Sequence, residues 1–163
     1  MVGNSTQAGP ALLCFDGSEG ARRAVDAASA VVGDRRAVVA HVWTPLMSGA
    51  FRYGPDIKLT DTVRAAAAEM DQAGERSAAA VADEGAELAR RAGFDPVEVV
   101  VEPAPEGTSA KLLEIANRID ASLVVVGAGG RRALGGLVGS VCHALANRSE
   151  RPVLIVPHQP GPG

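Results

Sequence analysis

Short apolar runs alternate along this chain with longer segments in which apolar positions recur every three or four residues. The first run, residues 11–15, contains no polar side chain and predicts a strand buried on both faces. It ends at the turn signal Asp16-Gly17-Ser18, and the spacing that follows predicts a helix with Ser18 as its N-cap and Gly33 as its C-terminal stop. Residues 37–43 form a second, mostly apolar run. The order strand, helix, strand predicts a parallel pair joined by a right-handed crossover.

The same alternation continues as far as residue 157. Positions three or four apart predict a long helix over residues 61–92, with one narrow stripe facing the sheet and Gly74 and Gly85 permitting close approach. That stripe consists of Val63, Ala67, Met70, Gly74, Ala78, Val81, Gly85, Leu88 and Ala92. Valine alternates with glutamate over residues 97–101, which predicts a half-exposed edge strand. The remaining predicted elements are a helix over 108–119, a central strand over 122–127, a short helix over 140–147 and a last strand over 152–157.

Five strands that alternate with four helices predict an α/β fold. We expect a single doubly wound, five-stranded parallel sheet with helices on both faces, Rossmann-like, in the strand order 3-2-1-4-5. Residues 10–157 are assigned to this domain, and the polar or Pro/Gly-rich residues 1–9 and 158–163 to disordered tails. The loop over residues 44–59 exceeds the ~4–6 residues usual between elements, and both a lid and a disordered insert fit its length.

Composition narrows the class of protein. The 163 residues, 47% of them apolar, suffice for one core and not for two ordinary domains. The net charge of −3 and the pI near 5.6 give no overall attraction to nucleic acid or to an anionic membrane. The chain opens without a basic, apolar leader and no apolar run reaches the ~20 residues that span a bilayer, so we expect a cytoplasmic protein. Cys14 and Cys142 lack the spacing of a metal or redox pair and are expected to be buried free thiols.

Ligands of doubly wound sheets bind beyond the carboxyl ends of the strands, where the strand order reverses, and a glycine-rich segment lies at one such end. Residues 127–140 join the central strand to a helix N-terminus, where glycines let a phosphate approach the backbone and the helix start attracts it. The alternative is that these glycines only permit tight turns and contact between helix and sheet. Neither a dinucleotide fingerprint nor a P-loop is present. Arg132 stands where the former needs glycine, and the only lysines are Lys58 and Lys111.

Asp16 closes the first strand at the same edge of the predicted sheet. Its carboxylate can accept a hydrogen bond from a ribose hydroxyl or a base amine, and Phe15 and Val42 would give the ring of such a ligand an apolar wall. The alternative for Asp16 is a cap on the first helix, a common position for aspartate.

Catalytic and metal-binding roles find little support in the sequence. Ser140 is not part of a G-x-S-x-G motif, His143 fits a surface position on the last helix, and His41 fits a satisfied, partly buried imidazole. The acidic residues lie mostly on helix faces, with no close pair for acid and base work. We therefore assign no catalytic residue and no metal ligand, and expect a protein that is not an enzyme.

Five segments together resemble the universal stress protein family. They are Phe-Asp-Gly-Ser-Glu at 15–19, His-Val at 41–42, Val-Val-Gly-Ala-Gly-Gly at 125–130, Gly-Ser-Val at 139–141 and Pro-Val-Leu-Ile-Val-Pro at 152–157. The match covers residues 10–157. It implies an adenine nucleotide alpha-hydrolase-like fold, a role in the stress response, and ATP as ligand, with or without Mg²⁺. The nucleotide-binding residues that it implies are Phe15, Asp16 and Val42 at the adenine and Gly127, Gly130, Gly139, Ser140 and Val141 at the ribose and phosphates, with Arg131 beside Gly130 as a further candidate.

The glycine segment departs from the family's pattern in its length. ATP-binding members carry glycine, two residues, glycine, nine residues and then Gly-Ser or Gly-Thr, whereas here only eight residues, 131–138, separate Gly130 from Gly139. The resemblance also implies a homodimer through antiparallel pairing of strand Val153–Val156 with its copy. We therefore expect a nucleotide-responsive regulatory protein that acts on an unidentified protein partner. The alternatives are an interaction dimer of the same fold that binds no nucleotide, and an adenylyl-transferring enzyme, whose His-x-Gly-His or Ser-Gly-Gly-x-Asp-Ser signature is absent.

Overall fold

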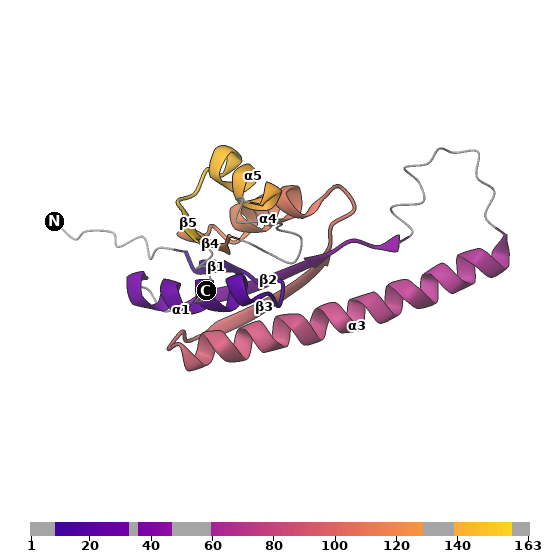
Figure 1. Ribbon diagram of the computed structural model, residues 1–163, viewed down its shortest axis with the longest axis horizontal. Coiled ribbons are helices and arrows are strands. Elements are labelled where there is room, and N and C mark those ends of the chain that lie inside the picture. The colour runs from indigo at the N-terminus through magenta and orange to yellow at the C-terminus, as the bar shows by residue number, and fades with distance from the viewer. Residues whose placement is uncertain (1–8, 33–35, 47–59, 129–138, 158–163) are drawn as a thin grey trace, which may run out of the picture.

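A computed structural model describes residues 9–32, 36–46, 60–128 and 139–157 (Figure 1). Its centre is a sheet in which every neighbouring pair of strands is parallel and the order is β3-β2-β1-β4-β5. The strands are β1 (Ala11–Cys14), β2 (Ala37–Trp43), β3 (Val97–Pro103), β4 (Leu123–Gly127) and β5 (Val153–Val156). The predicted order and parallel direction are therefore confirmed, and β3 lies at an edge as its Val/Glu alternation predicts.

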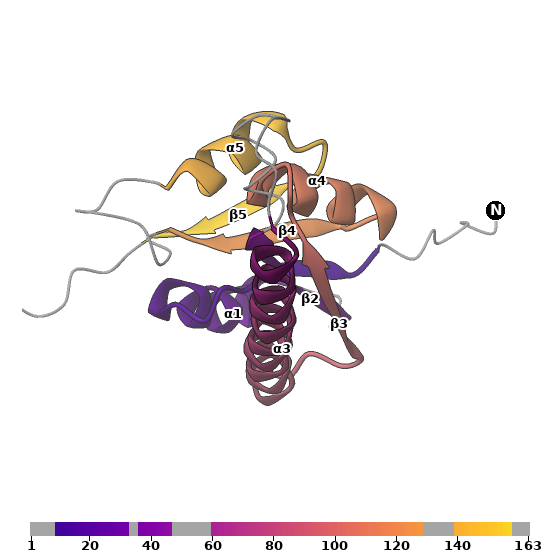
Figure 2. The same cartoon turned by 90° about the vertical axis from the view of Figure 1, so that its right-hand side faces the viewer.

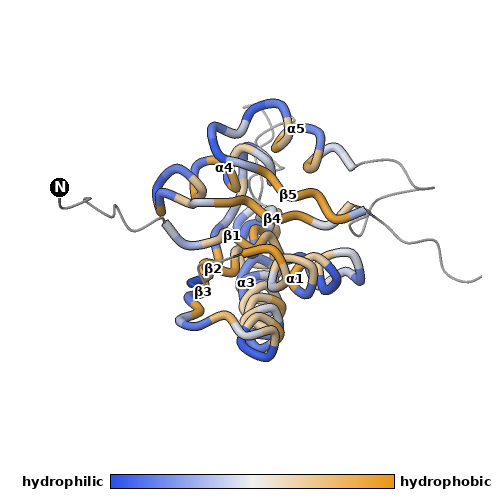
Figure 3. The backbone as a smooth tube through the Cα atoms, turned by 90° about the vertical axis from the view of Figure 1, so that its left-hand side faces the viewer, coloured by the Kyte–Doolittle hydropathy of each residue, from blue (hydrophilic) through white to orange (hydrophobic). Residues whose placement is uncertain are grey.

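Helices cover both faces of the sheet, as expected of a doubly wound fold. Figure 2 shows α1 (Glu19–Val31) and α3 (Asp61–Arg91) on one face, and α4 (Thr108–Arg118) and α5 (Ser140–Arg148) on the other. Side chains of β1 alternate between the two faces, so Ala11 and Leu13 join the core under α1 and α3, whereas Leu12 and Cys14 join the core under α4 and α5. The strands accordingly form an apolar layer between more polar helices (Figure 3).

Small side chains let the helices approach the sheet closely. Ala24 and Ala28 of α1 and Ala86 and Ala89 of α3 are at most 1% exposed. A Cβ atom at Gly85 would lie 2.7 Å from the Phe15 ring and 2.9 Å from Val39, which is closer than packed carbon atoms approach. A Cβ at Gly74 would lie 3.3 Å from the Trp43 ring. Both glycines therefore lie against the sheet, as the sequence predicts.

The stripe predicted along α3 is wrong at Val63 and Met70, whereas Ala67 is buried and Gly74 lies against Trp43. Val63 and Met70 are 49% and 61% exposed, and the buried positions of α3 are Ala67, Ala78, Ala82, Gly85, Ala86 and Ala89. The reason is length. Its 31 residues extend about 46 Å at the rise of an α-helix, whereas a strand of 7 residues such as β2 spans about 23 Å. The first turns of α3 therefore run past the sheet (Figure 1).

Other boundaries differ from expectation by small amounts. Ser18 is the N-cap of α1, as predicted, and Val31 at the far end of that helix is 66% exposed. The predicted stop at Gly33, most of the loop over 44–59, and all of both tails except Gly9 lie outside the described residues. Within the described part of the chain, no helix is both long enough and apolar enough to cross a membrane.

Replacing Gly85 by alanine is expected to lower the free energy of unfolding by about 1–3 kcal/mol, because the new methyl group overlaps Phe15 and Val39. Gly74→Ala is the matched control, since it makes the same change in the same helix. There the methyl meets only the ring of the partly exposed Trp43, and alanine favours the helix by up to about 1 kcal/mol. Urea unfolding followed by circular dichroism measures both. Equal destabilisation by the two substitutions would contradict close approach at Gly85 as the cause.

Candidate functional site

The carboxyl ends of β1 and β2 are joined by hydrogen bonds next to the point where the strand order reverses. Phe15 N donates to Ala40 O at 2.9 Å, and His41 Nδ1 lies 2.7 Å from Phe15 O. A carbonyl oxygen only accepts, so His41 Nδ1 carries the proton and donates it. The imidazole is partly buried and has a partner, as the sequence predicts. This ring fixes the first residue after β1 in place.

Asp16 holds the turn that leads from β1 into α1. Its Oδ1 accepts a hydrogen bond from Ser18 N at 3.0 Å, and Ser18 Oγ in turn accepts from Ala21 N at 3.1 Å. The cap of α1 is therefore Ser18, and the alternative that Asp16 caps this helix is wrong. Gly17, between them, has a φ of 75°, which glycine adopts without strain. The Asp16 side chain remains partly exposed at the end of β1.

Gly127, the last residue of β4, lies against the first turn of α1. A Cβ atom there would fall 2.3 Å from Gly20 O and 2.4 Å from Gly20 C, so no other residue fits without moving the helix. Close contact between helix and sheet, the alternative to phosphate binding for these glycines, therefore explains the glycine at position 127. This contact brings the N-terminus of α1 directly over the end of β4.

The first turn of α5 lies at the same edge. Gly139 is its N-cap, with φ −60° and ψ 157°, and supplies no side-chain cap, while nothing lies within 4 Å of where its Cβ would be. Ser140 is exposed, and Val141 is partly buried in the core under α4 and α5. Cys142 Sγ donates to Gly127 O at 3.4 Å and so ties the helix start to the end of β4. Gly130 and Arg131, the other candidates in this segment, lie outside the described residues.

Phe15 does not supply the apolar wall expected of it. Its side chain is 2% exposed and joins the core under α1 and α3, on the same face as Leu13, where it contacts Gly85. Strand alternation continues through Phe15 and sends the ring into that core. Val42, on the other face, is partly buried beside α4 and α5. Phe15 can therefore offer a ligand its backbone but not its ring.

Both cysteines are buried free thiols, as predicted, and they lie at this edge of the sheet. Burial, and then the nearby Cys142 and Asp16, raise the pKa of Cys14 to about 12. Burial also raises the pKa of Cys142, with a smaller contribution from Asp16. Among the described residues no three His, Cys, Asp or Glu side chains cluster as metal ligands would.

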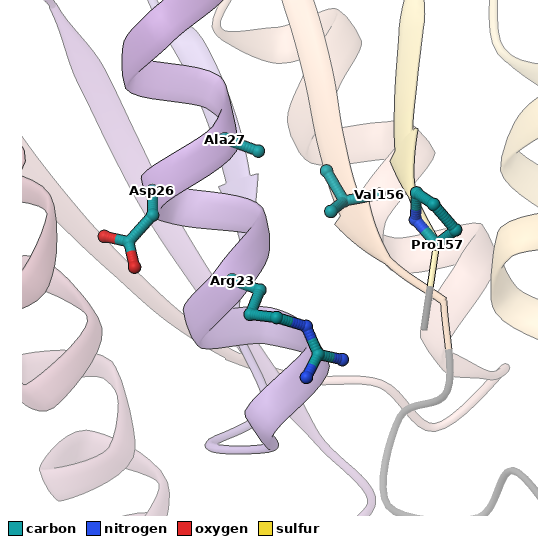
Figure 4. Close-up of a pocket in the computed structure, with 5 residues that line it drawn as sticks. All are labelled: Arg23, Asp26, Ala27, Val156 and Pro157. Carbon is teal, nitrogen blue, oxygen red and sulfur yellow. The ribbon is translucent and has the colours of Figure 1, made fainter. Parts of the chain in front are cut away.

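Sequence reasoning missed two features of this structure. The first is Gly107, the N-cap of α4, which has a φ of 112°, no side-chain cap and open space where a Cβ would be. A signal was present in Gly107-Thr108, a glycine directly before a predicted helix start. The second is a hollow of about 230 Å³ between α1 and the end of β5, which is not at the end of β1 and β2 (Figure 4). No sequence pattern marks it, because its walls come from segments more than a hundred residues apart.

The two thiols are expected to resist iodoacetamide at pH 8 in the folded protein and to react in urea, because only the thiolate is nucleophilic. The free energy of unfolding should be unaffected by Cys14 below its ordinary pKa of 9.0 and should fall as pH rises from there towards about 12. The sign follows because the unfolded chain releases this proton first. Mass spectrometry and urea unfolding at several pH values measure the two effects, with Cys14→Ala as control. Fast labelling of Cys14 without urea would contradict its burial.

Comparison with known proteins identifies the family. The sequence profile of the universal stress protein family matches residues 9–157. No curated protein sequence matches the chain significantly. Among solved structures, a universal stress protein in complex with cAMP shares 26% identity with a TM-score of 0.59, over 92% of this chain and 98% of that one.

Two further structures show the fold. A universal stress protein family member from Burkholderia pseudomallei is 22% identical with a TM-score of 0.64, over 94% of this chain and 98% of its own. The universal stress protein of Archaeoglobus fulgidus in complex with dAMP is 15% identical with a TM-score of 0.58, over 90% and 96%. Because the family profile spans nearly all of the sequence and the sheet has the predicted order, the chain belongs to the universal stress protein family.

Proposed function

We propose that this protein binds an adenine nucleotide, ATP in the first place, beyond the carboxyl ends of β1 and β4, and that it acts as a regulatory homodimer in the stress response. The observation that carries the proposal is the start of α5. Gly139 leaves the first backbone N–H groups of this helix without a side-chain cap, and the space beside it is open. Uncapped N–H groups together with the positive end of the helix dipole favour an anion.

The groups around this helix start suit the parts of a nucleotide. Phosphate oxygens would accept from the N–H groups of the first turn and from the exposed Ser140 hydroxyl. The partly exposed Asp16 carboxylate would accept from a ribose hydroxyl or the adenine amine. Val42 would supply apolar contact, and Phe15 only its backbone, because its ring is in the core.

The structural relatives support an adenine nucleotide as the class of ligand. The solved relative at 26% identity is in complex with cAMP, which shares its adenine and ribose with ATP and has a single phosphate. The segment between Gly130 and Gly139 is one residue shorter here than in the ATP-binding pattern. A shorter segment encloses less space, so cAMP and AMP are the ligands to compare with ATP.

We propose a sensor and not a turnover enzyme. His41 already donates to Phe15 O. The pKa values of Cys14 and Cys142 are raised, which keeps both thiols protonated at neutral pH. The two thiols described at this edge are therefore not available as nucleophiles, and Nδ1 of His41 is engaged in a hydrogen bond. The response to nucleotide would pass to a protein partner.

The exposed edge of β5 supports the homodimer. Pro152 O and Val156 O accept from β4, so by alternation the backbone groups of Val153 and Ile155 point away from the sheet. All four residues of β5 are partly exposed. An apolar edge of this kind is a template for another strand, and a second copy of β5 in antiparallel orientation would cover it. An interaction dimer that binds no nucleotide is the alternative, and it uses the same edge.

Substituting Gly139 by aspartate is expected to weaken ATP binding by tenfold or more while leaving stability unchanged or raised by a few tenths of a kcal/mol. Aspartate is a good N-cap, and its backbone angles here are ordinary for any residue, but its charge repels phosphate. Ala146→Asp is the matched control, because it adds the same charge to an exposed position near the other end of α5. Calorimetric titrations of nucleotide-stripped protein with ATP, AMP and cAMP measure the affinities.

Two outcomes would count against the nucleotide proposal. If none of the three nucleotides binds the intact protein, the interaction dimer takes its place. If Gly139→Asp and Ala146→Asp bind ATP equally well, the phosphate does not sit at the start of α5. Preference for cAMP over ATP would retain the site and change the ligand.

Replacing Ile155 by proline is expected to dissociate the dimer, because proline lacks the outward N–H that would pair with the second copy. Ile155→Ala is the control, since it removes more of the side chain from the core but keeps the N–H. Size-exclusion chromatography with light scattering measures the mass of each variant. A dimer that survives Ile155→Pro as well as Ile155→Ala does not form through β5.

A further inference from the structure

The hollow beside β5 lies at the free edge of the sheet. Arg23, Asp26 and Ala27 of α1 line one side of it, and Val156 and Pro157 at the end of β5 line the other. In Figure 4 Ala27 points towards Val156 and Arg23 extends towards Pro157, whereas Asp26 points the opposite way. The hollow is thus walled by the alkyl part of Arg23, a methyl group, a valine and a proline ring, with the Arg23 charge at its rim and the Asp26 carboxylate turned away from it.

Helix α1 has two flanks with different surroundings. On one flank Arg22 pairs with Glu84 of α3 at 2.6 Å. On the other flank Arg23 and Ala27 face β5. Residues four apart share a face of a helix, so Val31 follows Ala27 on this second flank. Val31 is 66% exposed, more than any other large apolar side chain among the described residues. Arg23, Ala27 and Val31 together are called the outer flank of α1.

We propose that the outer flank of α1 docks against the outer flank of a second copy, and that Val31 of each copy enters the hollow of the other. This rests on the homodimer through β5 proposed above. Antiparallel pairing of two identical edges generates a two-fold axis perpendicular to the sheet, so both α1 helices lie on the same face and run antiparallel. The outer flanks then face each other across the axis.

The lengths of the elements bring Val31 of the second copy to the hollow. Arg23 lines the same hollow as Pro157 and extends towards it, at the carboxyl end of β5 (Figure 4). Val31 lies eight residues further along α1, about 12 Å away at the rise of a helix. The 4 residues of β5 span about 10 Å from first to last, so Val31 is level with Val153. In the antiparallel pair, the outward backbone groups of Val153 in one copy meet those of Ile155 in the other, one residue before Val156 and the hollow. Val31 of the first copy then lies next to the hollow of the second.

Charge complementarity favours the same arrangement. Helix α1 carries no basic residue in its last turn, where a cation interacts favourably with the negative end of the helix dipole. Antiparallel docking places Arg23 of one copy beside the last turn of the other α1. Each outer flank thus has an apolar side chain and the negative helix end at Val31, and a hollow and a cation at Arg23. Under a two-fold axis the Val31 end of one copy meets the Arg23 end of the other, so the surface is self-complementary.

The test is Val31→Lys, measured as the dimer dissociation constant by analytical ultracentrifugation. Lysine suits the end of α1, so the fold is retained, but it puts a charge in the hollow and next to Arg23 of the other copy. We expect the constant to rise about tenfold or more, the range of an interface anchor. Met70→Lys, at an exposed position of α3, is the control and should leave it unchanged. Arg23→Glu combined with Val31→Lys should recover much of the lost affinity through the reversed charge pair.

The outcomes separate this inference from the homodimer itself. If Val31→Lys dimerises as tightly as the unaltered protein while Ile155→Pro dissociates, the strand interface stands and the docking of α1 is wrong. If the unaltered protein is monomeric at all concentrations, both are wrong. A bismaleimide cross-link between copies of Ala27→Cys, absent with the exposed Ala30→Cys, would support docking through the outer flank.

Discussion

The close approach of helices to the sheet is the constraint on which the other features depend. Where β4 ends, Gly127 meets the backbone of Gly20 with no side chain between them, and where β1 ends, Phe15 lies under Gly85. Alanines fill most of the remaining contacts of α1 and α3. A core with so few large side chains gains its dispersion energy from many short contacts. Small changes in side-chain volume therefore alter the free energy of unfolding strongly. The same tight packing holds the ends of β1, β2 and β4 in fixed positions.

The candidate site follows from that rigidity. His41 fixes the carbonyl of Phe15, Asp16 and Ser18 form the turn into α1, and Cys142 joins the start of α5 to β4. Each of these interactions positions backbone groups and leaves the Gly139 helix start open. A binding site built mainly from backbone depends on where the chain runs more than on which side chains it carries. Phosphate, which accepts hydrogen bonds from any N–H, is the ligand group that suits such a site best.

Much of the fold could be predicted because hydrophobic periodicity and element order carry most of its information. The all-apolar runs of β1 and β4 mark central strands, and Gly74 and Gly85 mark contact with the sheet. The site was predicted less completely. Periodicity shows that Val63, Met70 and Val31 could face a core, but it does not show where the core ends. Likewise, a sequence does not show that residue 127 must be a glycine because the backbone of Gly20 lies against it, since this contact depends on an element far away in the chain.

The length of α3 has a consequence for how the molecule opens. Its C-terminal turns pack against the sheet and against the side of α1, whereas in its first half only Ala67 is buried. An isolated stretch of helix shorter than about 12–15 residues is only marginally stable in water. Its first turns can therefore fray and re-form while the sheet stays intact, and backbone amide protection should climb along one continuous helix from almost none to that of the core. A single helix thus contains hydrogen bonds of very different local stability, which gives this domain a gradient of stability along one element.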